Sequence, residues 1–228
     1  MDSPSDPTYL DALGQYALRY VKPGQTLGLG TGRAASAFIR ALGGAGIKVS
    51  GVPTSNLSAQ LARSLGIRLL ELREAHRLDI DFDGADEVDP RLNMIKGHGG
   101  AMVREKVVAA AARRRIFLVG EEKLVARLGA HGNLPIEVVP FALAFATRRI
   151  GELGLKPAMR INEAGEHFVS DNGNIILDCR VRDIRYPARL DRELLAIPGV
   201  VGTGLFVAMA DLVLVVAPSG KVTTLRRR

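Results

Sequence analysis

Short apolar runs alternate with longer amphipathic stretches along the first half of the chain, and this alternation restricts the fold more than any other feature. Apolar runs that predict buried strands occupy residues 26–30, 47–52, 78–82 and 116–120. Stretches with apolar residues at helical spacing occupy residues 9–21, 33–42, 55–65 and 101–113. Strands separated by helices pair in parallel, because each helix returns the chain to the same end of the sheet. We therefore predict an α/β fold with a mostly parallel, doubly wound sheet.

The pattern changes near Asn133, where the strand-like runs lie closer together. Strands are expected at residues 136–140, 158–161, 167–170 and 175–180, with a helix over 141–153. Asp171-Asn172-Gly173-Asn174 separates the last two runs and predicts a hairpin turn. This spacing is typical of α+β structure, so we expect a smaller second domain.

The last apolar run, residues 211–216, is expected to return to the first sheet. The predicted domains are an α/β catalytic domain of residues 1–130 plus 204–228 and a small α+β domain of residues 131–203. The sequence leaves open whether the apolar segment 204–216 is core or a contact between subunits.

Composition excludes several classes of protein. No apolar stretch approaches the roughly 18 residues of a membrane span, and the polar, acidic N-terminus lacks the pattern of a signal peptide. The single cysteine, Cys179, excludes an intrachain disulfide and a cysteine-based zinc site, and we expect it to fill core space rather than act as a nucleophile. We predict a cytoplasmic protein with no membrane partner.

The net charge of +7 raises the question of nucleic-acid binding. The excess lies in short separate clusters, such as residues 113–115 and 226–228, and aromatic residues make up only 5% of the chain, without an RNA-binding motif. We therefore expect solvated basic surfaces and no nucleic-acid partner. The same positive field would attract an anionic metabolite.

Glycines cluster where the first predicted strand meets the following helix, in Gly28-Leu29-Gly30-Thr31-Gly32. Backbone N–H groups and the helix dipole at such a turn favour an anion. The spacing differs from the dinucleotide-binding pattern, no acidic residue ends the next strand, and the P-loop pattern is absent. The turn by itself therefore indicates an anion or a small polar ligand, or only a tight structural turn.

The segment from Asp83 to Glu105 is more specific. Asp83 and Asp86 follow a predicted parallel strand, at the edge where open α/β sheets bind ligands. Lys96 precedes the flexible segment 97–100, and Glu105 lies one turn into the next helix. This set suits proton abstraction beside a carbonyl, because a carboxylate takes the proton while an ammonium and N–H groups stabilise the enediolate oxygen. Alternatively, the aspartates cap a helix or lie in a solvated loop, and Glu105 pairs with a basic residue at the surface.

His98 is a candidate acid or metal ligand. None of the other histidines stands at a metal-binding spacing from it; they are His76, His131 and His167. We therefore predict no metal site and interpret His98 as a substitution within a loop.

Seven ordered blocks of the chain resemble type A ribose-5-phosphate isomerases, and together they span nearly the whole sequence. The blocks are GLGTG (28–32), VPTS (52–55), DGADEVD (83–89), IKGHGGAMVREK (95–106), EVVPFA (137–142), DNGNIILD (171–178) and IPGVVGTGLF (197–206).

The resemblance implies a Rossmann-like α/β domain with a smaller α+β domain, no metal or organic cofactor, and assembly as a homodimer or homotetramer. It implies interconversion of ribose 5-phosphate and ribulose 5-phosphate, through an enediolate, in the non-oxidative pentose phosphate pathway. Glu105 matches the base that moves the proton between carbons 1 and 2. Asp83 matches the group that helps to open the sugar ring, Asp86 a carboxylate that holds sugar hydroxyls, and Lys96 the group that stabilises the enediolate.

The substrate contacts that the resemblance further implies are Thr31, Gly32, Arg33, Ala34, Gly84, Ala85, Gly97, His98, Gly99 and Lys123. Several positions depart from the family. The Ser-Thr pair after GTG is Arg33-Ala34, a phosphate-binding lysine aligns with Leu10, His98 interrupts a run of glycines, and Asn56 follows VPTS. The catalytic set is thus kept while the phosphate-binding set is altered.

Arg33 begins a predicted helix at the altered positions. A guanidinium binds phosphate through two parallel hydrogen bonds, so we expect Arg33 to be the main phosphate ligand. The alternative is that Arg33 points to solvent and that the substrate differs.

Other functional classes predict different residues. A non-catalytic sugar-phosphate sensor should lack Glu105 or Lys96 and carry a helix-turn-helix segment, whereas both residues are present and the N-terminus has room for only one helix. An acyl or coenzyme A transferase of related topology would carry its carboxylate in a different motif. The same isomerase mechanism acting on another sugar or sugar phosphate is a further alternative.

Overall fold

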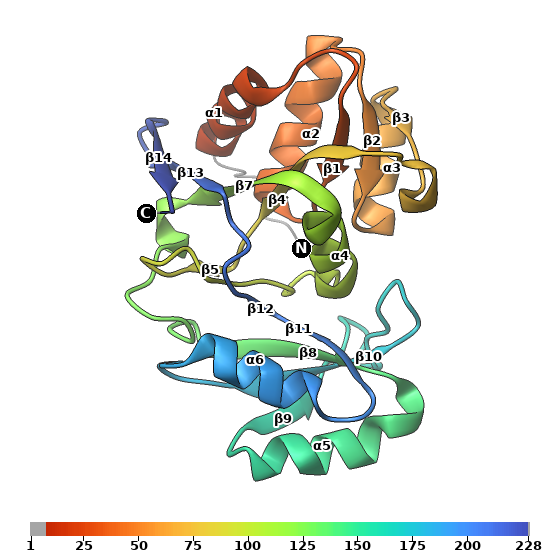
Figure 1. Ribbon diagram of the computed structural model, residues 1–228, viewed down its shortest axis with the longest axis vertical. Coiled ribbons are helices and arrows are strands. Elements are labelled where there is room, and N and C mark those ends of the chain that lie inside the picture. Colours follow the sequence, from red (N-terminus) through yellow and green to blue (C-terminus); the bar gives the residue numbers. More distant parts are fainter. Residues whose placement is uncertain (1–7, 228) are drawn as a thin grey trace. The chain divides into compact units, whose positions relative to one another are not determined.

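The computed structural model of the chain describes residues 8–227, and Figure 1 shows it as a ribbon. The chain divides into two compact units. The first unit extends to Gly84 and also contains Arg104–Lys123 and the chain from Met209 onward. The second unit contains Ala85–Val103 and Leu124–Ala208. Each unit is described separately below.

The first unit is built on a seven-stranded sheet in the order β14-β13-β7-β4-β1-β2-β3. The strands are β1 (Thr26–Leu29), β2 (Ser50–Pro53), β3 (Arg68–Leu69), β4 (Leu78–Gly84), β7 (Ala112–Gly120), β13 (Leu212–Val216) and β14 (Val222–Arg226). All neighbouring pairs are parallel except β13 with β14, which are antiparallel. The predicted α/β fold with a mostly parallel sheet is therefore confirmed.

Strand β13 pairs in parallel with β7, so the chain does return to the first sheet. All five residues of β13 are buried, as expected for a strand covered on both faces. This part of the apolar segment 204–216 is therefore core. The short edge strands β3 and β14 were not predicted, because their sequences are too short or too polar to give an apolar run.

Four helices contribute to the first unit: α1 (Thr8–Ala17), α2 (Arg33–Ala45), α3 (Asn56–Ser64) and α4 (Met102–Ala111), the last beginning in the second unit. Helix α2 packs on β4, where the rings of Phe38 and Phe82 stack with centroids 4.1 Å apart. Helix α3 begins with a capping box in which Ser55 and Ser58 bond each other's backbone N–H groups. Helix α1 is shorter than predicted, because the chain tightens into a 3-10 turn over Leu18–Tyr20.

The second unit contains a four-stranded antiparallel sheet in the order β11-β8-β10-β9 and a small sheet in the order β12-β6-β5. The strands are β5 (Glu87–Val88), β6 (Met94–Ile95), β8 (Asn133–Val138), β9 (Lys156–Met159), β10 (Ile175–Arg180), β11 (Val200–Thr203) and β12 (Leu205–Phe206). The helices are α5 (Leu143–Glu152) and α6 (Pro187–Leu195). The smaller α+β part is therefore confirmed as a separate antiparallel sheet with helices.

Several elements of the second unit differ from the prediction, and the short strands β5, β6, β11 and β12 were not predicted. Residues 167–170 form only isolated bridges, Ile161 with His167 and Val169 with Ile175, rather than a strand. Helix α6 was missed, because four of its nine residues are charged and only Leu194 is buried. The predicted turn at residues 171–174 is present, with Gly173 at a φ of 78°.

The boundaries of the compact units differ from those of the predicted domains. Residues 85–103, 124–130 and 204–208 were predicted in the first domain but lie in the second unit. These segments belong to the second unit because β5 and β6 pair with β12, and because Leu128 packs in the second core. Pairing over such long sequence separations leaves no local signal in the sequence.

Cys179 lies fully buried in the core of the second unit. Burial, with a smaller contribution from the charge of Asp178, raises the pKa of its thiol to about 12. Because the thiolate is the nucleophile, this residue packs rather than reacts, as predicted. Among residues 8–227, no helix has the length and apolar character that a bilayer crossing requires.

Candidate active site

In the first unit, the glycine-rich turn and Asp83 meet at the carboxyl ends of β1 and β4. Asp83 is fully buried, and its Oδ1 accepts hydrogen bonds from the backbone N–H groups of Thr31 (3.1 Å) and Gly84 (2.7 Å). Gly30 donates its N–H to the carbonyl of Phe82 at 2.9 Å. The carboxylate is thus fixed at the edge where ligands bind open α/β sheets.

A network of hydroxyls ties this turn to the end of β2. Thr31 Oγ1 lies 2.8 Å from Thr54 Oγ1 and donates to Ser55 Oγ at 2.8 Å. Ser55 in turn caps α3. Thr54 and Ser55 were not predicted as site residues, although both lie in the VPTS block. The proton of the Thr31 hydroxyl is directed to Ser55, so this side chain shapes the turn.

Glu105 is 3% exposed and lies on the side of α4 that faces the sheet. Val108, three residues later, packs on Gly28, where a side-chain β-carbon would come within 2.7 Å of its Cγ1. Residues three apart share a helix face, so Glu105 faces the sheet as well. It lies nearer the start of α4, which precedes β7 and therefore runs back from the carboxyl edge.

The same face of the sheet carries Asp81 and Asp83. Gly28 pairs with Asp81 in the register of β1 and β4, and the carboxylates of Asp81 and Asp83 occupy the spaces beside Gly28 and Gly30. Side chains two residues apart point to one face of a sheet, and Asp83 lies about 6–7 Å further toward the carboxyl edge. Asp83 and Glu105 therefore lie on one face of the sheet of the first unit.

Asp81 is a fully buried residue that the sequence analysis did not single out. The signal for it was present, because Asp79, Asp81 and Asp83 alternate along β4. Asp79 accepts the backbone N–H of Thr26 at 3.0 Å, near the opposite end of the strand. The alternation thus places a row of carboxylates along one face of β4.

The phosphate-side residues lie at the start of α2, which begins at Arg33. Gly32 precedes it with a φ of 99°, a backbone conformation that favours glycine. Arg33 is exposed and Ala34 half-buried, so both can reach a ligand at the positive end of the helix. Leu10, at the position of the family's lysine, is buried in the core and supplies no charge.

Lys123 ends the 3-10 turn Glu121–Lys123, which follows β7 directly. Strand β7 pairs in parallel with β4, so Lys123 lies at the carboxyl edge of the same sheet as Asp83. The side chain is half-buried. The structure therefore keeps Lys123 among the candidate ligands of an anionic substrate.

The second unit carries Asp86, Lys96 and the adjoining glycine-rich loop. Lys96 is 2% exposed, its N–H bonds the carbonyl of Gly204 at 2.9 Å, and its Nζ lies 5.4 Å from the ring centroid of Phe206. Asp86 Oδ2 accepts the backbone N–H of His98 at 3.0 Å, and Oδ1 lies 3.6 Å from His98 Nδ1. Asp86 therefore holds the loop as well as offering a carboxylate to a ligand.

The predicted site residues are thus divided between the units. The first unit holds Thr31, Gly32, Arg33, Ala34, Asp83, Gly84, Glu105 and Lys123, and the second holds Ala85, Asp86, Lys96, Gly97, His98 and Gly99. Gly84 is bonded directly to Ala85, so the two sets are adjacent along the chain. Within residues 8–227, no three His, Cys, Asp or Glu side chains are grouped as metal ligands.

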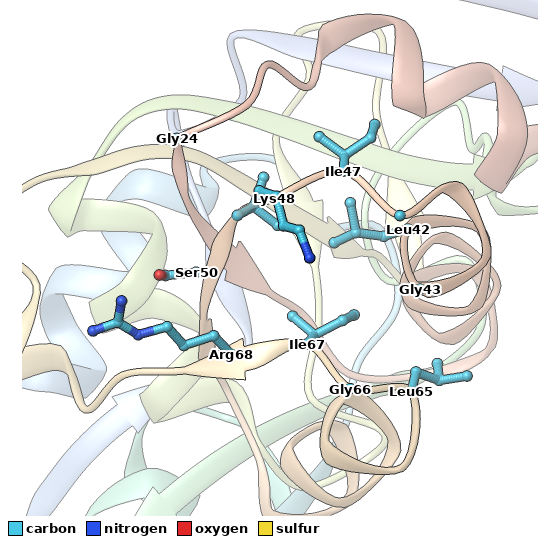
Figure 2. A pocket seen from close by; sticks show the side chains of 12 residues that line it. Gly24, Leu42, Gly43, Ile47, Lys48, Ser50, Leu65, Gly66, Ile67 and Arg68 are labelled. Carbon is cyan, nitrogen blue, oxygen red and sulfur yellow. The ribbon is translucent and has the colours of Figure 1, made fainter.

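A hollow of about 530 Å³ lies at the opposite end of the first unit's strands, and Figure 2 shows it with Lys48 projecting between Leu42 and Ile67. Helices α2 and α3 both end beside it, near Gly46 and Gly66. The carbonyl ends of helices carry partial negative charge and so oppose anion binding. None of the predicted site residues lines this hollow, so it is not the site of the predicted chemistry.

The family model of ribose 5-phosphate isomerase A (phosphoriboisomerase A) matches residues 50–220, which is well over half of the chain. The chain belongs to this family. It is therefore an isomerase, and the family's reaction interconverts ribose 5-phosphate and ribulose 5-phosphate. The resemblance, the fold class and the enzyme class expected from the sequence are confirmed.

Individual relatives support the same assignment. A ribose-5-phosphate isomerase A of Roseiflexus sp. is 46% identical over 222 residues, covering 95% of each chain. A solved D-ribose-5-phosphate isomerase in complex with phospho-erythronic acid superposes with a TM-score of 0.91 at 36% identity, covering 96% of this chain and 98% of that one. The isomerase of Methanocaldococcus jannaschii gives a TM-score of 0.90 at 38% identity, covering 96% and 98%.

Proposed function

We propose that this chain performs the family reaction by moving one proton between C2 and C1 of the open-chain sugar, with Glu105 as the base. The observation that carries the proposal is the buried Glu105 carboxylate on the face of the sheet that also bears Asp83. A carboxylate with little access to water is a stronger base toward a carbon acid, because desolvation disfavours its charged form.

In the proposed mechanism, Asp83 first moves the proton of the C1 hydroxyl to the ring oxygen as the bond between C1 and that oxygen breaks, which opens the furanose ring to the aldehyde. Glu105 then takes the proton from C2, the electron pair of that C–H bond forms the C1=C2 double bond, and the carbonyl pair at C1 moves onto O1 to give the enediolate. Lys96 and a backbone N–H of the 97–100 loop stabilise the enediolate oxygen, and Asp86 holds sugar hydroxyls. The hydroxyl proton on O2 moves to O1, and Glu105 returns its proton to C1 as the C2 carbonyl forms, which yields the ketose with the base regenerated.

The phosphate is proposed to bind at the start of α2, through Arg33 and the backbone around Thr31, Gly32 and Ala34, with Lys123 contributing charge. The positive end of a 13-residue helix and an exposed guanidinium support this placement. The remaining proposed contacts are the backbone groups of Gly84 and Ala85 and the loop residues Gly97, His98 and Gly99.

Arg33→Ala is expected to raise KM for ribose 5-phosphate at least about tenfold with kcat little changed. A hydrogen bond to a charged group is worth about 1.5–3 kcal/mol, and about 1.4 kcal/mol corresponds to tenfold in affinity. Arg40→Ala is the matched control, because Arg40 is an exposed arginine on the same helix, two turns further along. Steady-state kinetics of both variants test the assignment, and an unchanged KM in Arg33→Ala contradicts it.

The substrate is tested by a coupled isomerase assay across pentose, tetrose and hexose phosphates, with unphosphorylated ribose as a control. We expect ribose 5-phosphate to give the highest kcat/KM and ribose to be turned over poorly. The buried Leu10 and the Arg33-Ala34 pair favour an alternative, the same mechanism acting on another sugar phosphate. Preference for a different sugar phosphate would select that alternative, and no isomerisation of any would overturn the proposal.

The mechanism uses only side chains and backbone groups. Prolonged treatment with EDTA followed by gel filtration is therefore expected to leave kcat within about twofold of the untreated enzyme. A rate that falls and returns only on addition of a divalent metal would contradict a cofactor-free reaction.

We further propose a cytoplasmic homodimer or homotetramer acting in the non-oxidative pentose phosphate pathway. Support for assembly comes from large apolar side chains exposed on the single chain, including Phe141 and Tyr186 in the second unit. Light scattering of the purified protein measures the assembly, and a monomeric mass at micromolar concentration would exclude it.

A further inference from the structure

Arg160 lies at the end of β9 and contacts the glycine-rich loop of the second unit. We propose that Arg160 is a positioning residue, which fixes the 97–100 loop so that the N–H of Gly99 points at the enediolate oxygen. The inference rests on the proposed function, because it assigns a role within that reaction. Neither the family resemblance nor the predicted site included this residue.

The contacts run from one guanidinium nitrogen to two consecutive carbonyls. Arg160 Nη1 donates to the carbonyl oxygen of Gly97 at 3.0 Å and to that of His98 at 2.9 Å. A charged donor makes stronger hydrogen bonds than a neutral one. The orientation of two successive peptide groups is thereby set from one side.

The planarity of the peptide gives these contacts a chemical consequence. In a trans peptide, the carbonyl of one residue and the N–H of the next point in opposite directions. The Gly97 carbonyl faces Arg160, and the N–H of His98 accordingly points to Asp86, which accepts it at 3.0 Å. The His98 carbonyl also faces Arg160, so the N–H of Gly99 points away from the guanidinium.

Gly99 is then the loop donor best placed for a ligand. The N–H of His98 is taken by Asp86, and that of Gly100 by the carbonyl of Gly97 at 2.9 Å. A backbone donor held in a fixed direction stabilises a developing oxyanion, because it needs no reorganisation during the reaction.

The guanidinium is itself held by the antiparallel sheet. Asp178 on β10 accepts its Nε at 2.8 Å and its Nη2 at 2.5 Å, and Asn133 on β8 donates to the same carboxylate at 3.0 Å. Burial alone would raise the pKa of Asp178, but the hydrogen bonds and charge of Arg160, with the Asn133 amide and His98, hold it below its usual value. The pair is therefore ionised at neutral pH.

Phe168 completes the support beneath the loop. The Arg160 Cζ lies 5.7 Å from the centroid of its ring. The ring also fills the space beside Gly100, where a β-carbon would lie 2.5 Å from two ring carbons. The loop thus packs on an aromatic ring and is held by hydrogen bonds from one arginine.

The test compares Arg160→Met and Arg160→Lys with Arg127→Met. Arg127 is the matched control, because its guanidinium bonds Asp183 at the exposed surface of the same unit. We expect Arg160→Met to lower kcat about 10²-fold with KM within about threefold, because the loop donors act in the transition state. Arg160→Lys should lower kcat at least about tenfold, since an ammonium cannot replace the planar guanidinium and its several fixed donors. Arg127→Met should match wild type.

Binding of phospho-erythronic acid provides a readout that needs no turnover. Its planar carboxylate resembles the enediolate, so its Kd should rise in Arg160→Met by about the factor by which kcat/KM falls. Calorimetry measures this Kd, and thermal melts establish that each variant is folded. If Arg160→Met does not fold, kcat and the Kd of the analogue in Arg160→Lys test the positioning role.

The outcomes separate the two proposals. Wild-type kcat and wild-type Kd for the analogue in folded Arg160 variants would overturn the positioning role, and so would a raised KM with unchanged kcat. Absence of isomerase activity in the wild-type chain would instead overturn the proposed function, while the Kd comparison would still report on Arg160.

Discussion

Replacing Glu105 by glutamine is expected to lower kcat by at least about 10³-fold while KM for ribose 5-phosphate stays within about threefold. General acid–base catalysis typically contributes about 10²–10⁴-fold, and the amide keeps the shape of the side chain but accepts no proton. Because Glu105 is buried and faces the sheet, no bulk water can take over its role. The enediolate would then not form at a measurable rate.

The coupled assay measures the loss, and proton NMR in D₂O measures exchange of the C2 hydrogen directly. Both should fall together, since both require the same proton transfer. Glu152→Gln is the matched control, because Glu152 ends α5 at the surface, where it pairs with Arg149. Rapid C2 exchange in Glu105→Gln would show that another group is the base.

Replacing Gly30 by alanine is expected to destabilise the protein by about 2 kcal/mol and to lower kcat/KM at least about 10²-fold. The new β-carbon would lie 2.5 Å from the Cα of Asp83, and it would also clash with the Asp83 carboxylate. Backbone cannot move aside as a flexible side chain can, so the strands must separate or Asp83 must turn. Either response displaces the carboxylate that is proposed to open the sugar ring.

Gly44→Ala is the control for this substitution. Gly44 lies in α2, where a β-carbon would have no atom within 4 Å, so alanine should be neutral or stabilising by about 0.5–1 kcal/mol. Chemical denaturation and kinetics are measured for both variants. Wild-type stability and activity in Gly30→Ala would contradict the close packing of Gly30 on Asp83.

Sequence patterns predicted the elements that carry strong local signals. Five of the first unit's strands were predicted from apolar runs, and the register of β1 with β4 brings the glycine-rich turn beside Asp83. The position of Glu105 one turn into α4 is also as predicted. Short or polar elements were missed, such as β3 and α6. When only one or two side chains of an element are buried, its sequence shows no hydrophobic periodicity that would predict it.

Partners that lie far apart in the sequence could not be predicted. Arg160 bonds the carbonyl of Gly97 across 63 positions, and Asp178 holds it from a different strand. Neither residue belongs to a sequence pattern that would predict a contact with the 97–100 loop. Their roles depend on how the antiparallel sheet is paired, which is decided by the whole second core.

The sequence by itself determined the α/β class and the side chains that are proposed to react at the carboxyl edge of the sheet, because periodicity and motif residues are local properties. Only the tertiary structure decided that the Thr31 hydroxyl bonds Ser55 at the end of β2, that Asp81 is buried beside Asp83, and that one arginine bonds two carbonyls of the glycine-rich loop. The direction of a peptide N–H follows from the groups that surround it in space, and those groups are brought together only when distant strands pair.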